Sequence, residues 1–148
     1  MTAIAKIRAK LASYPALAIE ESPGWIAVRP PGELSFEVGL RECDGGFTVH
    51  FDAWHEEIVL EEAALELFAM GLSTSVRLKV TSRGTFDHCW TVERRDGDEW
   101  RPGSTTGLIF FPFWRSKKVR YLQNTVTESG EKGGARHRDT TDETRWLT

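Results

Sequence analysis

The strongest constraint on the fold is a run of alternating apolar and polar residues between Leu34 and Phe51. Every second residue from 34 to 40 is apolar, and the same alternation returns from Phe47 onward, after a turn at Asp44-Gly45-Gly46. Residues two apart on a strand share a face, and Asp-Gly is a favoured hairpin turn. The run therefore predicts an antiparallel hairpin with one buried face and one solvent-facing face.

Two other segments show the three- and four-residue spacing of an amphipathic helix. Thr2 can cap the first helix, and Pro15 ends it. The second runs from Val59 to Leu72, with glutamates crowded at its start, where the helix dipole favours negative charge. The inner stripes of the two helices are predicted to be Ile4, Ile7, Leu11, Leu65, Phe68 and Leu72.

The second half of the chain returns to strand-like alternation over residues 76–80 and 86–92, with further strand signals at 107–111 and 119–122. Runs of strands separated by isolated helices and hairpin turns favour antiparallel pairing over alternating βα units. We therefore predict an α+β fold, a mostly antiparallel twisted sheet of six to eight strands with two helices packed on one face. The helix stripes should meet the sheet at Phe36, Val38, Phe47, Val49, Leu78 and Trp90.

The chain of 148 residues suits one domain. Beyond Gln123 the apolar pattern stops, and a polar, glycine-containing segment of mixed charge follows. Such a segment cannot bury enough apolar surface to fold alone. The sequence predicts a single domain over residues 1–123 and a mobile polar tail over 124–148, in which Trp146 has no assigned role.

Cysteine usage and the absence of targeting signals bear on location. Cys43 and Cys89 belong to no CxxC motif or His/Cys cluster, so no disulfide framework or zinc site is indicated. No segment is long and apolar enough to span a bilayer, and no phosphate-binding or dinucleotide motif is present. We expect a cytoplasmic protein with reduced thiols, no membrane partner and no cofactor.

The first candidate site centres on His88, which shares a strand face with Phe86 and Trp90. Sheets covered by helices often enclose ligands on their inner face, where the helix residue Phe68 would also lie. These four residues could line a pocket for a small apolar or aromatic ligand. The alternative is that His88 is a hydrogen-bonded core residue.

The second candidate site combines His50, Asp52 and His55. Two imidazoles and a carboxylate that converge could hold a divalent metal or act as an acid/base pair. The alternative is the solvent face of an amphipathic strand. No known ligand spacing is matched, so no metal site is assigned, and the sequence leaves open whether any reaction is catalysed.

The third candidate is the aromatic and basic segment from Gly107 to Tyr121. Leu108 to Phe111 is apolar on both faces, which fits a central strand or an edge that meets a partner. Phe111, Phe113 and Trp114 are predicted to form an interface in a homodimer or with another protein. Basic residues follow them, but the formal charge of −3 for the whole chain argues against nucleic acid.

Three functions remain after these arguments. A non-catalytic domain that binds a small molecule in an aromatic pocket comes first, because aromatic residues are abundant and no complete catalytic motif is present. A homodimerising or partner-docking protein comes second. An enzyme that uses the His/Asp cluster comes third.

Overall fold

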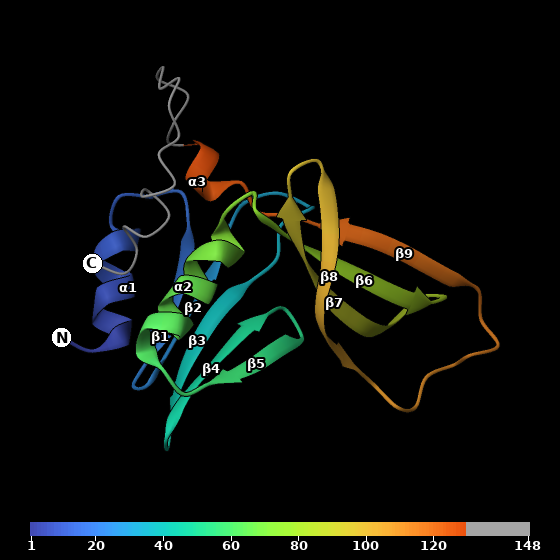
Figure 1. Ribbon diagram of the computed structural model, residues 1–148, viewed down its shortest axis with the longest axis horizontal. Helices are drawn as coiled ribbons and strands as arrows, with labels where there is room; N and C mark the ends of the chain where they lie inside the picture. Colours follow the sequence, from blue (N-terminus) through green and yellow to red (C-terminus); the bar gives the residue numbers. More distant parts are fainter. Residues whose placement is uncertain (130–148) are drawn as a thin grey trace.

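The computed structural model describes residues 1–129 and has the predicted α+β fold (Figure 1). Within those residues, nine strands form two antiparallel sheets, of five and four strands, and the longer helices are α1 (Ala3–Leu11) and α2 (Glu61–Leu72). The strands are therefore shared between two sheets rather than gathered in one. None of the described helices has the length and apolar character needed to cross a bilayer.

The first sheet is a simple meander in which each strand pairs with the next along the chain. The predicted hairpin forms its centre, with Leu40 opposite Val49, although its first strand begins at Val38 rather than Leu34. The five strands are β1 (Ala18–Ser22), β2 (Trp25–Arg29), β3 (Val38–Cys43), β4 (Gly46–Phe51) and β5 (Trp54–Ile58).

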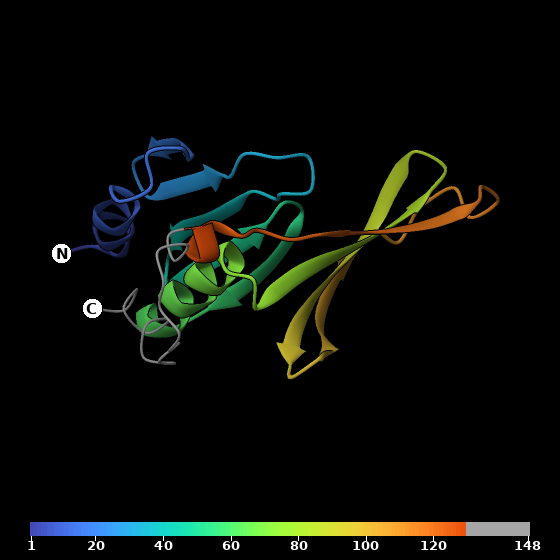
Figure 2. The ribbon, with the colours of Figure 1, turned by 90° about the horizontal axis from the view of Figure 1, so that it is seen from above.

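The second sheet extends away from the helices, as Figure 2 shows from above. Its order is β8-β7-β6-β9, so the last strand returns to pair with the first strand of this sheet. The register of β6 and β7 shifts between Thr81 and Ser82. The four strands are β6 (Val76–Arg83), β7 (Phe86–Asp96), β8 (Glu99–Gly107) and β9 (Lys117–Leu122).

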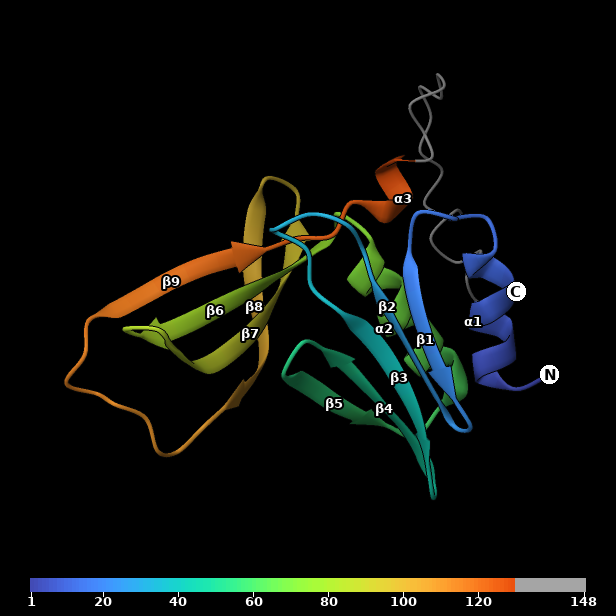
Figure 3. The ribbon, with the colours of Figure 1, turned by 180° about the vertical axis from the view of Figure 1, so that it is seen from behind.

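The core lies between the helices and the first sheet, and Figure 3 shows strands β1 to β5 in front of α2. Helix α1 begins as predicted, since the Thr2 hydroxyl accepts a hydrogen bond from the Ala5 amide. All six predicted stripe residues belong to the buried core. Their predicted sheet partners are confirmed too, with Phe36, Val38, Val49 and Leu78 in the core and Phe47 and Trp90 packed against it.

The folded part of the chain continues past the predicted boundary at Gln123. Asn124 is 1% exposed and Val126 is buried, and a short helix, α3 (Val126–Ser129), follows. The Asn124 side-chain amide donates to the carbonyls of Phe36 and Gly71, and Val126 belongs to the buried core, so both residues are part of the folded domain. The rest of the predicted tail, including Trp146, lies outside the described residues.

Two segments differ from the secondary structure predicted for them. Residues 54–58 form strand β5, where the sequence suggested a turn and acidic residues leading into a helix. Residues 108–111 are not a strand, because β8 ends at Gly107 and the chain then runs as a loop to β9. This second difference determines the candidate site.

Candidate functional site

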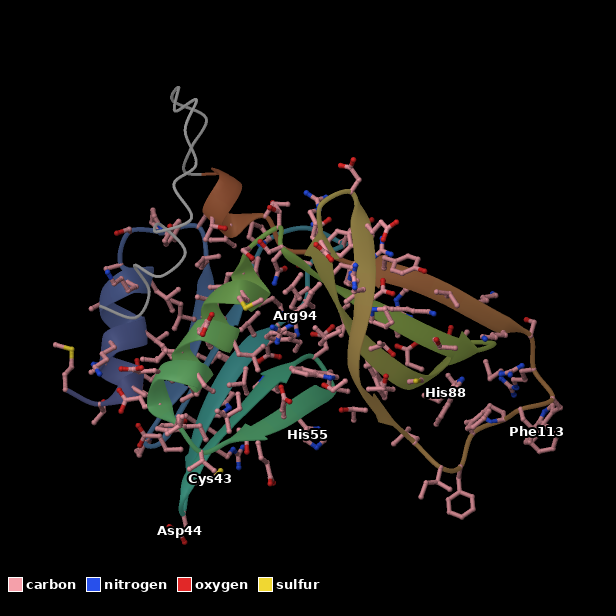
Figure 4. The ribbon with its side chains drawn as sticks, in the orientation of Figure 1. Cys43, Asp44, His55, His88, Arg94 and Phe113 are labelled. Atoms are coloured by element: carbon pink, nitrogen blue, oxygen red, sulfur yellow. The ribbon has the colours of Figure 1, made fainter. Side chains whose placement is uncertain are left out.

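The loop over residues 108–116, between β8 and β9, carries the most exposed apolar side chains in the second sheet. Ile109 and Phe110 are each 88% exposed, Trp114 is 73% exposed and Phe113 is 70% exposed. Figure 4 shows Phe113 at the end of the molecule farthest from α1 and α2. Monomeric soluble proteins rarely leave large contiguous apolar surface in water, so these residues are a candidate interaction site. We call residues 108–114 the apolar loop.

One residue of the apolar loop turns inward and anchors it. The Phe111 ring stacks on the imidazole of His88, with ring centroids 4.1 Å apart and an interplanar angle of 7°. The Leu108 amide donates to the His88 carbonyl at 2.8 Å, and the guanidinium of Arg83 lies 5.9 Å from the Phe111 ring centre. The exposed side chains are therefore presented by a loop with a defined conformation.

The outward residues of the loop are also ordered relative to one another. Phe113 and Trp114 contact edge to face, with centroids 5.4 Å apart. The Phe113 amide donates to the Phe111 carbonyl at 2.8 Å, and the Arg115 amide donates to the Pro112 carbonyl at 3.0 Å. These backbone hydrogen bonds form two consecutive tight turns that hold both aromatic rings toward solvent.

Positive charge lies directly behind the apolar loop. Arg115, Lys117 and Lys118 are exposed, whereas Arg120 is paired with Asp87 by two hydrogen bonds of 2.7 and 2.8 Å. This hydrogen bonding to Arg120 lowers the pKa of Asp87. Residues 76–122 carry ten Lys and Arg against five Asp and Glu, whereas residues 1–75 carry five against twelve. The second sheet is thus basic and the rest of the fold acidic.

The four predicted pocket residues lie in different surroundings. Phe68 is fully buried in the core, and Trp90 packs against that core. Phe86 is 41% exposed at the start of β7, and His88 is covered by Phe111. The structure therefore brings His88 together with a predicted interface residue rather than with Phe68.

The space beneath α2 is occupied by aromatic side chains. The Phe51 ring lies 5.3 Å from the Phe36 ring and 4.8 Å from the Trp54 ring, and all three residues are at most 1% exposed. An open depression of about 470 Å³ lies instead on the second sheet, near the apolar loop. It is lined by Ser82, Gly84, Thr85, Asp87, Lys118, Val119 and Arg120.

His50 and Asp52 lie near a third charged residue, Glu37, which the sequence did not single out. The Nε2 atom of His50 is 3.8 Å from a carboxylate oxygen of Glu37, whose backbone amide donates to Asp52 at 2.8 Å. Burial lowers the pKa of His50 and raises the pKa of Asp52, because both charged forms lose solvation. The feature of the sequence that could have pointed to Glu37 is Gly39, because this glycine makes room for His50 to lie over β3.

The predicted His/Asp cluster is only partly assembled. His55 lies opposite His50 in the β4–β5 pairing, but its Nδ1 atom lies 3.3 Å from the Ala53 carbonyl of the adjoining turn. Asp52 occupies that turn with a φ of 50°. No group of three or more His, Cys, Asp or Glu side chains positioned to hold a metal ion occurs within residues 1–129.

Comparisons of the chain with protein-family models, with curated proteins and with solved structures found no match. The function is therefore argued from the geometry of the described residues. Among the three candidate sites, the apolar loop has the largest departure from what folding alone would produce, since folding tends to bury large apolar side chains.

Proposed function

We propose that this chain is a non-catalytic binding protein that docks onto a macromolecular partner through the apolar loop. The supporting observation is that Ile109 and Phe110 are 88% exposed on a loop whose neighbouring residue, Phe111, is held against His88. Apolar surface removed from water contributes about 25 cal/mol per Å², so these side chains can supply much of a binding free energy.

The composition and order of the loop also support docking. Aromatic residues and arginine are enriched at the energetic centres of protein interfaces, and Phe113, Trp114 and Arg115 are consecutive here. A loop already held by the Phe111–His88 stack loses less conformational entropy on binding than a disordered one would.

Site-specific photo-crosslinking tests this proposal in cells that natively make the chain. A benzophenone side chain replaces Phe113 in one variant and the exposed strand residue Glu20 in the control. We expect a discrete adduct, identified by mass spectrometry, from position 113 only. The adduct should disappear when Ile109 and Phe110 are both changed to serine.

Two outcomes would overturn the docking proposal. One is the absence of any adduct from position 113. The other is the same set of adducts from positions 113 and 20, which would indicate random collision. We also propose a cytoplasmic location, which the free thiols of Cys43 and Cys89 support.

A small apolar or aromatic ligand beside His88 is the second candidate function. It is favoured by one observation: the Nε2 atom of His88 is buried and has no hydrogen-bond partner among the described residues. A ligand that accepts or donates at this atom would satisfy it. A thermal-shift screen should find a stabilising compound whose effect is lost in His88→Leu and reduced in Trp90→Ala. An undiminished shift in His88→Leu would contradict it.

A further inference from the structure

A second exposed apolar patch lies at the junction between β5 and α2. Val59 is 77% exposed and Leu60 is 69% exposed, although the residues on either side of them enter a strand and a helix. Glu56 and Glu57 precede this pair, and Glu61 and Glu62 follow it. We call residues 56–62 the acidic junction, because two apolar side chains are framed by four glutamates.

The β3–β4 turn adds further negative charge beside the acidic junction. A Cβ atom placed on Gly46 would come within 2.6 Å of the Ile58 carbonyl and 3.2 Å of the Val59 Cα, so the turn lies against the junction. Asp44 in this turn is exposed, as are Glu57 and Glu62. Glu61 already pairs with Lys6 at 2.7 Å. Asp44, Glu57 and Glu62 remain available to cationic side chains of a partner.

The acidic junction and the apolar loop are complementary in both polarity and charge. Each presents exposed apolar side chains, one framed by carboxylates and the other followed by Arg115, Lys117 and Lys118. Figure 4 shows Asp44 and Phe113 at well-separated ends of the molecule, so the two surfaces of one chain do not meet.

We propose that the partner of the apolar loop is the acidic junction of a second copy of this chain. The inference rests on the proposed docking function and names its partner. Ile109, Phe110, Phe113 and Trp114 of one copy cover Val59 and Leu60 of the next, while lysines behind the loop face Glu57 and Glu62. Opposite charge around an apolar centre steers association and fixes the relative orientation of the partners.

This contact joins two different surfaces, so it repeats head to tail. Each copy offers one loop and one junction, and the assembly either closes into a ring or grows as a filament. A two-fold dimer could form this contact only by making it twice between the same two copies, whereas a dimer that paired the loop with itself would bring the basic side chains of both copies together. The unequal charge of the two halves of the fold therefore favours contact between loop and junction over contact between two loops.

A complementation experiment with the purified full chain tests the inference. Leu60→Glu disrupts the apolar surface of the acidic junction and leaves the apolar loop unchanged. Trp114→Glu disrupts the apolar loop and leaves the acidic junction unchanged. Both residues are exposed, so both variants should fold, which circular dichroism checks. By sedimentation velocity we expect concentration-dependent oligomers of the wild type and monomers of each variant alone. A mixture of the two variants should form a 1:1 dimer that cannot grow.

Charge reversal supplies an independent measurement. Lys117→Glu with Lys118→Glu, and separately Glu57→Lys with Glu62→Lys, should each weaken association at least tenfold. A mixture of the two reversed proteins should regain two contacts, the native one and one in which acidic and basic residues have exchanged places. Raising the salt concentration should weaken the wild-type contact, because screening reduces attraction between exposed charges.

Several outcomes would overturn the inference. These are a monomeric wild type at high concentration, oligomers of Leu60→Glu equal to those of the wild type, or no dimer in the mixed variants. The crosslink from position 113 separates this failure from failure of the docking proposal. An adduct with a different protein would leave the docking function standing and reject self-association, whereas the lack of any adduct would reject both.

Discussion

Gly39 lies directly against the imidazole ring of His50, its partner across the β3–β4 pair. A Cβ atom on Gly39 would come within 1.9 Å of the His50 Cε1 atom, a distance that no two non-bonded carbon atoms tolerate. The glycine therefore leaves the space that lets His50 lie over the sheet and reach Glu37.

Gly39→Ala should destabilise the protein by about 1–3 kcal/mol, because the ring must swing away from its position over β3. Urea unfolding measures the loss. The matched control places the same change in a His50→Ala background, where the ring is absent and the alanine should cost almost nothing. Equal costs in the two backgrounds would show that the contact does not constrain His50.

Phe68→Ala should cost on the order of 3–5 kcal/mol, because this side chain of α2 is fully buried in the core and its removal leaves a cavity. The control is Phe110→Ala, the same chemical change at a residue that is 88% exposed, which should stay within about 0.5 kcal/mol of the wild type. A loss below about 1 kcal/mol for Phe68→Ala in a urea melt would contradict the packing of the helix stripe.

His50 and Asp52 should give stability opposite dependences on pH. Burial lowers the pKa of His50 below its ordinary 6.5, so its contribution is complete above that pH and is lost as the pH falls through the folded-state pKa. Burial raises the pKa of Asp52 above 3.8, so its contribution is complete below that pH and is lost as the pH rises through the folded-state pKa.

Difference curves isolate these two residues from the other titrating groups. The free energy of unfolding is measured across this range of pH for the wild type, His50→Gln and Asp52→Asn. The wild type should lose stability relative to His50→Gln as the solution is acidified below pH 6.5. Relative to Asp52→Asn, it should lose stability as the pH rises above 3.8. Two curves of the same sign would contradict the assigned burial.

Asn124→Ala should destabilise the fold by at least about 3 kcal/mol, because three buried backbone groups lose their partners. Its side chain accepts from the Phe36 amide and donates to the carbonyls of Phe36 and Gly71. Gln123→Ala, which removes one part-buried hydrogen bond to the Thr74 carbonyl, should cost about 1 kcal/mol. Similar urea midpoints for the two variants would show that Asn124 is not a central link.

The sequence predicted the buried faces well because their period is set by local backbone geometry. Residues two apart on a strand share a face whatever the rest of the chain does, so Val38, Leu40 and Val49 could be assigned to the core. The same holds for the helix stripes, in which Phe68 and Leu72 are both fully buried.

Strand β5 could not be predicted from the sequence because its residues fit two different structures. Glu56 and Glu57 are favoured at a helix start, yet they are equally tolerated on an edge strand with one solvent-facing side. Only the pairing of Phe51 with Trp54 across a two-residue turn resolves the ambiguity, and that turn depends on the left-handed conformation of Asp52.

The apolar loop could be only partly predicted from the sequence, because apolar residues are normally buried. Leu108 to Phe111 were expected in a strand, whereas Ile109 and Phe110 are almost fully exposed. The stack of Phe111 on His88 depends on the register that pairs Cys89 with Gly107, and alternation alone does not set the register between two strands.

The position of Asn124 has a consequence for how the protein is made. The last strand of the first sheet ends at Ile58. Asn124, which is translated much later, forms hydrogen bonds with Phe36 in the connection between β2 and β3. A chain still being synthesised therefore contains all five strands of the first sheet before it contains the side chain that holds the β2–β3 connection. That connection can be secured only once residue 124 has been made, after the strands of both sheets.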